Sequence, residues 1–544
     1  GHGDHDATGR GVPLVELRTA RNSRYVTDSA GRAAFDEPAL MHQRVYFYAK
    51  SHGYEVPEDQ FGFRGKAFDV TPGGAGELRI NRVNLAERLY RMTGGGIYRD
   101  SVLLCEQAPI DEPLLNAGVL GSDSVVNAVF NGQIYWFWGD TNLPKHPLGL
   151  FHVPGATSRL PVDGGLDPSV GVNLKYIVDD AGQARNTCQM QGDGPTWIDG
   201  LTVLTDTDGH ERMFAHYVKI KPPLETYRRG LCEFNLQSDS FEPLKELDKD
   251  DWRRPAGHPV RIAADGDDHV VFSRPFPYTR VPATVAAFTD PARYEAYTCL
   301  VPGDDPDAPR VVRGEDGRPA YAWRRDGIPL EAKFANKLVD SGVLERSELA
   351  FQLYDCATDK PLRSSTVALA WNGYRRMRTM IVQEVFGTSV LGEIWYAEAP
   401  APTGPWHDAV KIVTHDNYSF YNPKQHPMLE GRGGRDIYFE GTYTKSFTNN
   451  PDPTPRYEYN QVMYRLDLAD PRLGLSDGRV TDDADHSVPT LGVVGALGGK
   501  SFWPRMIVAR GQRGGRSCGD PAIATSRRSS AGRFPGTGPP MRAR

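Results

Sequence analysis

One strand-turn-strand pattern recurs five times in this 544-residue chain and limits its fold more than any other feature. Each copy has an apolar strand, a turn centred on glycine, a second apolar strand, and a polar residue where that second strand ends. The copies occupy residues 124–140, 200–219, 259–276, 366–384 and 426–443. Together with the strand pairs between them, each copy makes about four strands, which is one blade of a β-propeller. The alternative is a set of unrelated β-sandwiches.

The polar residues at the strand ends favour the propeller. In a propeller, equivalent ends of equivalent strands converge on one rim, whereas unrelated sheets give no reason for such regularity. The five polar ends are Asp140, His216, Arg274, Glu384 and Glu440. We therefore predict an all-β chain whose residues 115–500 form a five-bladed β-propeller. A helical pattern at 329–345 predicts an inserted helix near residues 300–350.

The segments on either side of the propeller differ from it. Residues 11–92 contain short alternating stretches between turn residues and predict a small β-sandwich, followed by a linker at 93–114. Residues 1–10 are expected to be a flexible N-terminus, although their "GHGDHD" run has side chains that bind divalent metals. Residues 501–544 are rich in Arg, Gly, Ser and Pro and predict a low-complexity tail that cannot bury a core.

Composition limits the classes of partner. The formal net charge is -6 and the pI is near 6.2, so neither nucleic acid nor an acidic membrane surface is indicated, and a polar or neutral ligand fits better. No apolar run approaches the roughly 18 residues of a membrane span. No nucleophile elbow, P-loop or Rossmann fingerprint occurs, and the six cysteines lack zinc spacing. We expect a secreted or periplasmic protein whose leader precedes the numbered chain.

The first copy of the pattern gives the sharpest prediction. In "GSDSVVNAVFNGQIYWFWGDTN" (121–142), Asn131-Gly132 indicates a two-residue type I′ turn between two strands. With that turn, the residue numbers of every cross-strand pair sum to 263, which sets Asp123 opposite Asp140. Their Cα atoms should lie roughly 4.5–5.5 Å apart. Either the ladder frays and each aspartate caps a strand, or the two carboxyl groups form the close pair that retaining glycoside hydrolysis requires.

Three stretches together resemble a known family. They are "GSDSVVN...IYWFWGDT", "GEIWYAEAPAPTGPW" and "YNPKQHPML...IYFEGTYT". They resemble the five-bladed propeller glycosidases, including the arabinanase and xylosidase-like enzymes, and most closely the propeller family that contains the endo-D-arabinanases. The resemblance covers roughly residues 115–470. It implies a first-blade pair of aspartates that act as nucleophile and acid/base, and these fall on Asp123 and Asp140.

A second, shorter resemblance lies in the predicted sandwich. The stretch "RYVTDSAGRAAFDEP" resembles the carboxypeptidase regulatory-like, transthyretin-like modules, through Thr27, Asp28, Gly31 and Phe35. Such modules usually serve as accessory or spacer domains. The resemblance therefore implies an accessory role for residues 11–92.

The hairpin also suggests roles for the two aspartates. Retaining pairs stand about 5–5.5 Å apart and inverting pairs about 6.5–9.5 Å, so direct cross-strand neighbours favour retention. We predict Asp123 as the nucleophile, because the starts of inner strands point at the propeller axis. Asp140 becomes the acid/base, because the apolar indole of Trp138 beside it would raise its pKa. If the pair is wider, Asp123 becomes the general base and Glu384 or Glu440 the acid; each glutamate is otherwise an ordinary rim charge.

Sugar subsites need aromatic faces and planar polar groups. The predicted rim offers Asn127, Trp138, Trp197, Arg274, Tyr278, Tyr418, Tyr421 and Lys424, each of which alone could be core or surface. His426 is expected on an innermost strand, where propeller glycosidases sometimes place a histidine near an axial cation, and a structural histidine is the alternative. No cofactor is required on this interpretation, and a structural calcium or other cation on the axis is compatible with it.

Three classes of function stay open at this point. The first is a glycoside hydrolase that acts on a polysaccharide or oligosaccharide in an axial pocket. The second is a propeller that binds glycan, or assembles into a surface structure, without catalysis. The third is a polysaccharide lyase, which would use a Tyr, His or Lys base and often calcium. The fold cannot choose between them. The opposed aspartates favour the hydrolase, because a binding module has no reason to bear their repulsion.

Overall fold

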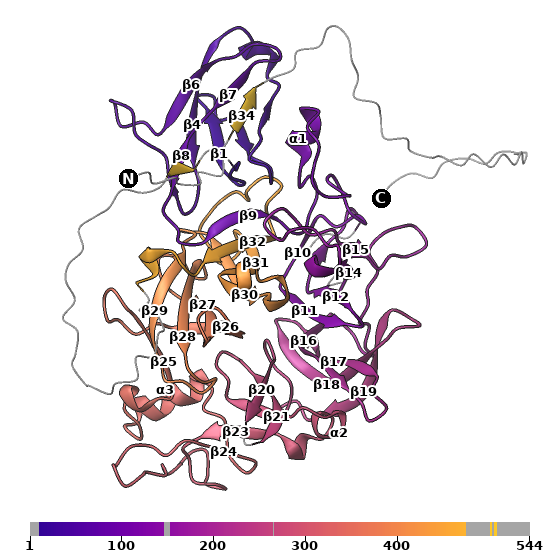
Figure 1. Ribbon diagram of the computed structural model, residues 1–544, viewed down its shortest axis with the longest axis vertical. Helices are drawn as coiled ribbons and strands as arrows, with labels where there is room; N and C mark the ends of the chain where they lie inside the picture. The colour runs from indigo at the N-terminus through magenta and orange to yellow at the C-terminus, as the bar shows by residue number, and fades with distance from the viewer. Residues whose placement is uncertain (1–9, 146–152, 265, 475–500, 503–504, 509–544) are drawn as a thin grey trace, which may run out of the picture.

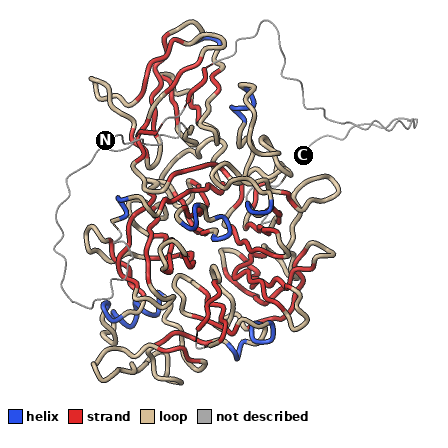
Figure 2. The backbone as a smooth tube through the Cα atoms, viewed as in Figure 1, coloured by secondary structure: helices blue, strands red, loops and turns tan. Residues whose placement is uncertain are grey.

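The computed structural model describes residues 10–145, 153–264, 266–474, 501–502 and 505–508. A large region of radially arranged sheets carries a smaller β domain at one side (Figure 1). Strands dominate both regions, and the helices are short (Figure 2). The "GHGDHD" run and most of the predicted tail lie outside the described residues. None of the described helices is long and apolar enough to cross a membrane.

Five antiparallel sheets build the large region. Blade I contains β11 (Val125–Phe130), β12 (Gln133–Trp138), β14 (Gly155–Arg159) and β15 (Lys175–Tyr176). Blade II contains β16 (Thr196–Thr205), β17 (Glu211–Lys221), β18 (Glu225–Asn235) and β19 (Ser240–Leu247). Blade III contains β20 (Val260–Ala264), β21 (Asp267–Phe272), β22 (Thr279–Pro282), β23 (Glu295–Thr298) and β24 (Ala322–Arg324).

The last two blades complete the ring. Blade IV contains β26 (Ser364–Asn372), β27 (Met377–Glu384), β28 (Glu393–Ala399) and β29 (Trp406–Val413), with β25 (Phe351–Asp355) added in parallel. Blade V contains β30 (Ser419–Gln425), β31 (Asp436–Thr444), β32 (Asn460–Asp467) and β9 (Glu87–Arg91). The first strands of four of the blades are neighbours, since β11 contacts both β16 and β30, and β26 contacts β30. The predicted five-bladed β-propeller is therefore confirmed.

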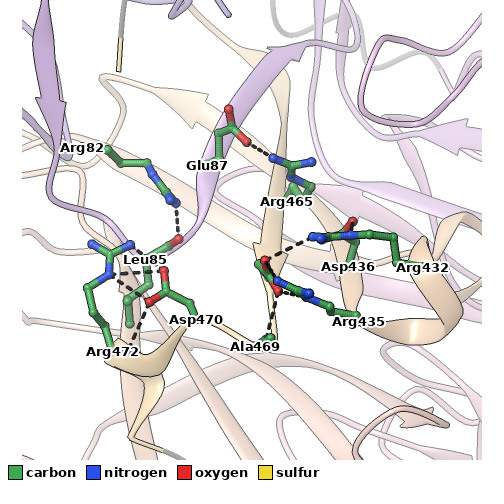
Figure 3. Close-up of polar contacts among 11 residues, drawn as sticks. Arg82, Leu85, Glu87, Arg432, Arg435, Asp436, Arg465, Ala469, Asp470 and Arg472 are labelled. Carbon is green, nitrogen blue, oxygen red and sulfur yellow. Dashed lines mark hydrogen bonds and ion pairs between the residues drawn. The ribbon is translucent and has the colours of Figure 1, made fainter. Parts of the chain in front are cut away.

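Strand β9 closes the ring from the other end of the chain. It precedes the propeller in sequence, yet it is the outermost strand of blade V and pairs antiparallel with β32. The ion pair between Glu87 and Arg465, at 2.5 Å, joins the two strands (Figure 3). At the end of β32, Arg435 forms an ion pair with Asp467 at 2.7 Å. The predicted sandwich boundary at residue 92 therefore falls too late, because β9 belongs to the propeller. Its pairing is long-range, so no local pattern marks it.

The smaller domain has three sheets. One contains β1 (Glu16–Thr19), β2 (Arg24–Val26), β4 (Arg44–Lys50) and β6 (Gly65–Asp69). The others contain β3 (Ala34–Phe35), β34 (Arg505–Val508) and β7 (Ala75–Glu77), and β33 (Ser501–Phe502), β8 (Ile80–Arg82) and β5 (Tyr54–Glu55). The described residues beyond 500 thus pair with the N-terminal domain, which the prediction of a tail from residue 501 did not include. Composition carries no information about such distant partners.

Shorter elements complete the chain. They are β10 (Gly121–Ser122), β13 (Thr141–Asn142), α1 (Arg99–Leu103), α2 (Val285–Phe288), α3 (Ala332–Asp340), and the 3-10 turns η1 (Pro38–Leu40), η2 (Pro161–Asp163), η3 (Pro291–Arg293), η4 (Arg346–Glu348), η5 (Pro427–Leu429), η6 (Arg432–Gly434) and η7 (Pro471–Leu473). Helix α3 is the predicted inserted helix, and it buries Ala335 and Leu338. Among the described cysteines, Cys105 is disulfide-bonded and the other four are free.

The fifth copy of the sequence pattern begins earlier than predicted. Its first strand, β30, ends at Gln425, and His426 to Gly434 run through η5 and η6 instead of forming a strand. Pro427 opens η5, and a proline that lacks an N–H suits the first position of a helical turn better than a paired strand. His426 therefore lies one residue past the innermost strand.

Candidate active site

The predicted hairpin is present in the predicted register. Its two-residue turn has positive φ at both positions, 48° and 75°, as a type I′ turn requires. Val125 pairs with Trp138 in the β11–β12 ladder, and β10 pairs with β13 in the same register on the far side. Between these ladders, Asp123 N donates to Asp140 O at 2.8 Å. The two aspartates therefore stand opposite each other, in a short gap between two paired segments.

Both carboxyl groups face a cavity at the hub of the propeller. It has a volume of about 440 Å³. Its walls come from the starts of inner strands and the ends of second strands, as expected for a propeller rim. They include Asp123, Trp138, Asp140, Trp197, Asp199, His216, His258, Ser273, Arg274, Thr366 and Asn422. The polar rim predicted from sequence thus exists for Asp140, His216 and Arg274.

Asp140 is a buried carboxyl group, with 8% of its surface exposed. Burial, and after it the negative charge of Asp123, raise the pKa of Asp140 to about 7. Trp197 Nε1 donates to Asp140 Oδ1 at 2.8 Å and opposes this rise. A carboxyl group that titrates near neutral pH can both give and take a proton, which is the property of a general acid/base.

Asp123 differs from Asp140 in that several hydrogen-bond donors surround it. Its Oδ1 accepts hydrogen bonds from Ser124 N at 2.6 Å, Ser124 Oγ at 2.7 Å and Thr442 Oγ1 at 3.1 Å. Its Oδ2 accepts from the Tyr459 hydroxyl at 2.8 Å. The Tyr421 hydroxyl also contacts Asp123, and burial together with this carboxylate raises the pKa of Tyr421. These converging donors hold the Asp123 carboxyl group in one orientation, as a nucleophile requires.

The predicted sugar-binding aromatic residues divide into two groups. Trp138, Trp197 and Tyr421 lie at the cavity or against its aspartates. Tyr278 does not: its ring packs against Phe351, with centroids 4.9 Å apart, in the core. A tyrosine at a blade end can turn inward or outward, and the residue type alone does not tell which.

Tyr418 also lies away from the cavity lining. Its ring stacks on Tyr443 with centroids 4.4 Å apart, and its hydroxyl donates to Glu458 Oε2 at 2.7 Å. It therefore braces the loop before β32. Its place one residue before β30 put it in the predicted rim, but its side chain points into blade V.

Glu384 and Glu440 do not line the cavity. Glu384 ends β27 as predicted, but its Oε2 accepts from Trp395 Nε1 at 2.8 Å within blade IV. Burial raises its pKa. Glu440 lies in the middle of β31, not at its end, and is fully buried. Neither glutamate that the alternative inverting scheme names as its acid therefore lines the cavity.

Glu440 belongs to a second polar cluster on the propeller axis, which we call the axial cluster: Asn127, Lys424, His426 and Glu440. Asn127 Nδ2 donates to His426 Nδ1 at 2.9 Å, and His426 Nε2 lies 3.2 Å from Glu440 Oε1. Lys424 is the cross-strand partner of Glu440, and burial lowers its pKa to about 8. Within the described chain, neither Glu440 oxygen accepts a hydrogen bond. Two of the predicted sugar-binding residues, Asn127 and Lys424, thus stand here with the predicted cation neighbour His426, outside the cavity wall.

Several site residues were missed by the sequence analysis. Tyr459 and Thr442 donate to Asp123 from blade V, and Asp199 and His258 line the cavity from blades II and III. Asp199 could have been found from sequence, because it is the cross-strand partner of His216, which was itself predicted to face the rim. For Tyr459 there was none, since it precedes β32 in a loop and reaches Asp123 only through the closure of the ring.

Comparison with known proteins adds a likeness in structure only. No model of a known protein family matches the sequence, and no curated protein matches it. An exo-1,5-α-L-arabinanase from a bovine ruminal metagenomic library aligns at 11% identity and a TM-score of 0.33, over 64% of this chain and 94% of that one. An exo-β-1,3-galactanase from Phanerochaete chrysosporium aligns at 8% identity and a TM-score of 0.32, over 64% of this chain but only 61% of that one.

A third solved structure gives similar values. It is the α-L-arabinanase of Cellvibrio cellulosa complexed with arabinohexaose, at 11% identity and a TM-score of 0.32, over 63% of this chain and 91% of that one. At identities and TM-scores this low, function has to be inferred from the site itself.

Proposed function

We propose that this protein is a glycoside hydrolase that cleaves a polysaccharide or oligosaccharide in the cavity at the propeller hub. The opposed pair of Asp123 and Asp140 carries the proposal. In a retaining mechanism one carboxylate attacks while the other gives and then takes a proton. The surroundings of the two aspartates suit these two roles. Hydrogen-bond donors hold Asp123, the proposed nucleophile, while burial and a like charge raise the pKa of Asp140, the proposed acid/base, to about 7.

The first step forms a glycosyl-enzyme. Asp140, protonated, donates its proton to the glycosidic oxygen, and the carboxylate of Asp123 attacks the anomeric carbon. The carbon–oxygen bond to the leaving sugar breaks, that sugar departs as an alcohol, and an ester joins the remaining sugar to Asp123. Loss of the negative charge on Asp123 at this step removes one cause of the raised pKa of Asp140, which helps it stay ionised for the second step.

The second step releases the product. Asp140, now a carboxylate, takes a proton from a water molecule while the water oxygen attacks the anomeric carbon. The ester bond breaks, Asp123 is again a carboxylate, and Asp140 is again protonated. The two inversions at the anomeric carbon give net retention. Ser124, Thr442 and Tyr459 hold Asp123 in one orientation through both steps.

Other residues support binding. Trp197 lines the cavity and supplies apolar contact area for a sugar ring, whereas Trp138 behind the wall is only 1% exposed and packs in the core. In the axial cluster, His426 Nε2, Asn127 Oδ1 and both Glu440 oxygens are buried without hydrogen bonds in the described residues, and these atom types fit a cation. A cation held there would compensate the buried charge of Glu440 and stiffen the hub. We place the activity outside the cytoplasm, where polysaccharides and disulfides such as that of Cys105 persist.

Hydrolysis of a panel of polysaccharides and aryl glycosides tests the proposal. The wild-type protein is compared with Asp123→Asn and Asp140→Asn, with Glu384→Gln as the matched loss of a carboxylate outside the cavity and circular dichroism as the folding check. We expect both aspartate variants to lose at least 10²- to 10⁴-fold in kcat/KM, roughly the contribution of a proton-transfer group. Full activity in either variant would refute the mechanism. A product that absorbs in the ultraviolet, formed by both variants, would indicate a lyase instead.

A further inference from the structure

The part of the cavity built by blades II and III collects positive charge. Arg274 lines the cavity, and so does His216, which is only 1% exposed. Burial, followed by the charges of Arg254, Arg229 and Arg274, lowers the pKa of His216 well below its usual range. The three guanidinium groups are therefore close enough to act on one imidazole. They also act on one another, and the pKa of Arg254 is lowered to about 10 by burial and by its two arginine neighbours.

Acidic groups offset this cluster only in part. Glu331 and Asp199 raise the pKa of Arg254, and Asp250, Asp248 and Glu331 raise that of Arg229, yet burial and the neighbouring arginines lower both pKa values overall. Arg274 Nη1 reaches Asp199 Oδ2 at 3.5 Å, a long contact, and 60% of the Arg274 side chain is exposed. Asp199 already accepts from the backbone N–H groups of Gly200 and Gly257, each at 2.9 Å. Arg229 Nε and Nη1 and Arg254 Nε are buried and have no acceptor in the part of the chain that the structure describes. Buried like charges with unused donors are costly unless something negative joins them.

The same wall holds unused neutral donors. Ser273 Oγ is buried without a partner, and so are His258 Nδ1 and both ring nitrogens of His216, as far as the described residues go. A neutral imidazole carries one N–H, so each histidine offers at most one donor. All three side chains line the cavity. Buried polar groups in proteins are nearly always hydrogen-bonded, so a cluster of unsatisfied ones at a cavity wall points to a ligand that supplies acceptors.

The arginines do not serve the catalytic pair. The groups that shift the pKa of Asp140, apart from its burial, are Asp123, Trp197 and Tyr459. Arg274 forms its ion pair with Asp199, not with Asp123 or Asp140. The positive charge therefore has a separate role from that of holding a catalytic carboxylate ionised.

We propose that the wall formed by His216, Ser273 and Arg274, with Arg229 and Arg254 behind it, is an anion subsite that binds a negatively charged substituent of the glycan. The substrate is then an acidic glycan, bearing either the carboxylate of a uronic acid or a sulfate or phosphate ester. Guanidinium groups match the planar oxygens of such anions and hold them by paired hydrogen bonds. The substrate class rests on the proposed hydrolase activity, whereas the anion subsite itself does not require hydrolysis.

Binding to the hydrolysis-deficient Asp123→Asn protein tests the subsite. The probes are D-galacturonate, D-galactose 6-sulfate and neutral D-galactose, measured by calorimetry and by tryptophan fluorescence at low and high salt. Arg274→Gln and Arg254→Gln remove the proposed contacts in that background. The matched control is Arg261→Gln, because Arg261 is an exposed arginine on β20 that pairs with Asp268 at 3.4 Å, away from the cavity lining.

We expect at least one anionic sugar to bind tenfold or more tightly than galactose, with the better of the two identifying carboxylate or ester recognition. Arg274→Gln should abolish that preference, Arg254→Gln should reduce it severalfold, and Arg261→Gln should leave it unchanged. Equal affinity for the three sugars, or a preference that survives Arg274→Gln, would overturn the subsite.

The two proposals can fail separately. If anionic sugars bind as expected but the wild-type protein hydrolyses nothing, the anion subsite stands and the hydrolase fails. If neutral glycans are hydrolysed and the anionic probes bind no better than galactose, the hydrolase stands and the anion subsite fails.

Discussion

Two acidic sites lie near the propeller axis, and they have unlike surroundings. The cavity pair, Asp123 and Asp140, faces open space and is met by tryptophan, serine, threonine and tyrosine donors. Glu440 in the axial cluster is fully buried beside His426, and its oxygens accept no hydrogen bond in the described chain. If the cavity pair is catalytic, as we propose, the difference lies in two things beyond position in a blade: room for a substrate, and hydrogen-bonding neighbours around the carboxyl groups.

The largest difference between the cavity pair and the axial cluster should appear in kcat/KM. We expect Asp123→Asn to lower kcat/KM on the order of 10⁴-fold, as loss of a catalytic nucleophile commonly does. Glu440→Gln should stay within about threefold of wild type, since Glu440 does not line the cavity. Steady-state kinetics on the best substrate of the panel measures both. A Glu440→Gln loss as large as that of Asp123→Asn would erase the contrast between the sites.

The stability of the cavity pair should depend on pH. Because its pKa is raised from 3.8 to about 7, folded Asp140 holds a proton that the unfolded chain has lost, so stability falls as pH rises from about 4 to 7. Asp140→Asn removes this cost. The variant should match wild type near pH 4 and exceed it by roughly 2–4 kcal/mol above pH 7. Denaturant unfolding at both pH values measures the difference, and a constant gap would contradict the raised pKa.

Loss of the carboxylate in the axial cluster should lower the stability of the protein, whereas loss of the Asp140 carboxylate should raise it. Glu440→Gln replaces the acidic neighbour of His426 Nε2, 3.2 Å away, by a neutral amide and so removes the electrostatic attraction between two buried side chains. We expect a loss of roughly 1–3 kcal/mol in the free energy of unfolding at neutral pH. Thermal and denaturant unfolding of the two purified proteins gives the value. A variant more stable than wild type would mean that the buried carboxylate is an uncompensated cost, like that at Asp140.

The smallest effect should come from the hydrogen bond between Trp197 and Asp140. The indole N–H lowers the pKa of Asp140, so Trp197→Phe should move the alkaline limb of the kcat/KM profile to higher pH, by about 0.5–1 unit. Trp136→Phe is the matched control, because Trp136 Nε1 donates to Ser158 instead, at 2.9 Å. A limb that does not move, or that shifts to lower pH, would assign the titration to another group.

The sequence predicted best where a single local contact decides the structure. Asn131-Gly132 sets the turn of the β11–β12 hairpin, and the turn sets the register that brings Asp123 opposite Asp140. The inserted helix α3 followed from its own apolar spacing. In both cases the information lies within about twenty residues.

The parts that were missed depend on distant pairing or on side-chain direction. Strand β9 joins β32 across the whole propeller, and Tyr459 reaches Asp123 only because that ring closes. Glu384 and Tyr278 stand at blade ends as predicted, yet Glu384 bonds Trp395 within blade IV and Tyr278 packs against Phe351 of the neighbouring blade, so neither lines the cavity. A strand end fixes where a residue lies, while the packing of the next strand decides which way it points.

The claim that Asp123 attacks the sugar can be tested most directly by trapping the glycosyl-enzyme. The protein is incubated with an activated 2-deoxy-2-fluoro glycoside of the sugar that the panel identifies, which slows the second step, and is then digested for mass spectrometry. The account predicts one added sugar on the peptide that contains Asp123, and none in Asp123→Asn. An adduct on Asp140, or turnover with an inverted anomeric product and no adduct, would contradict it.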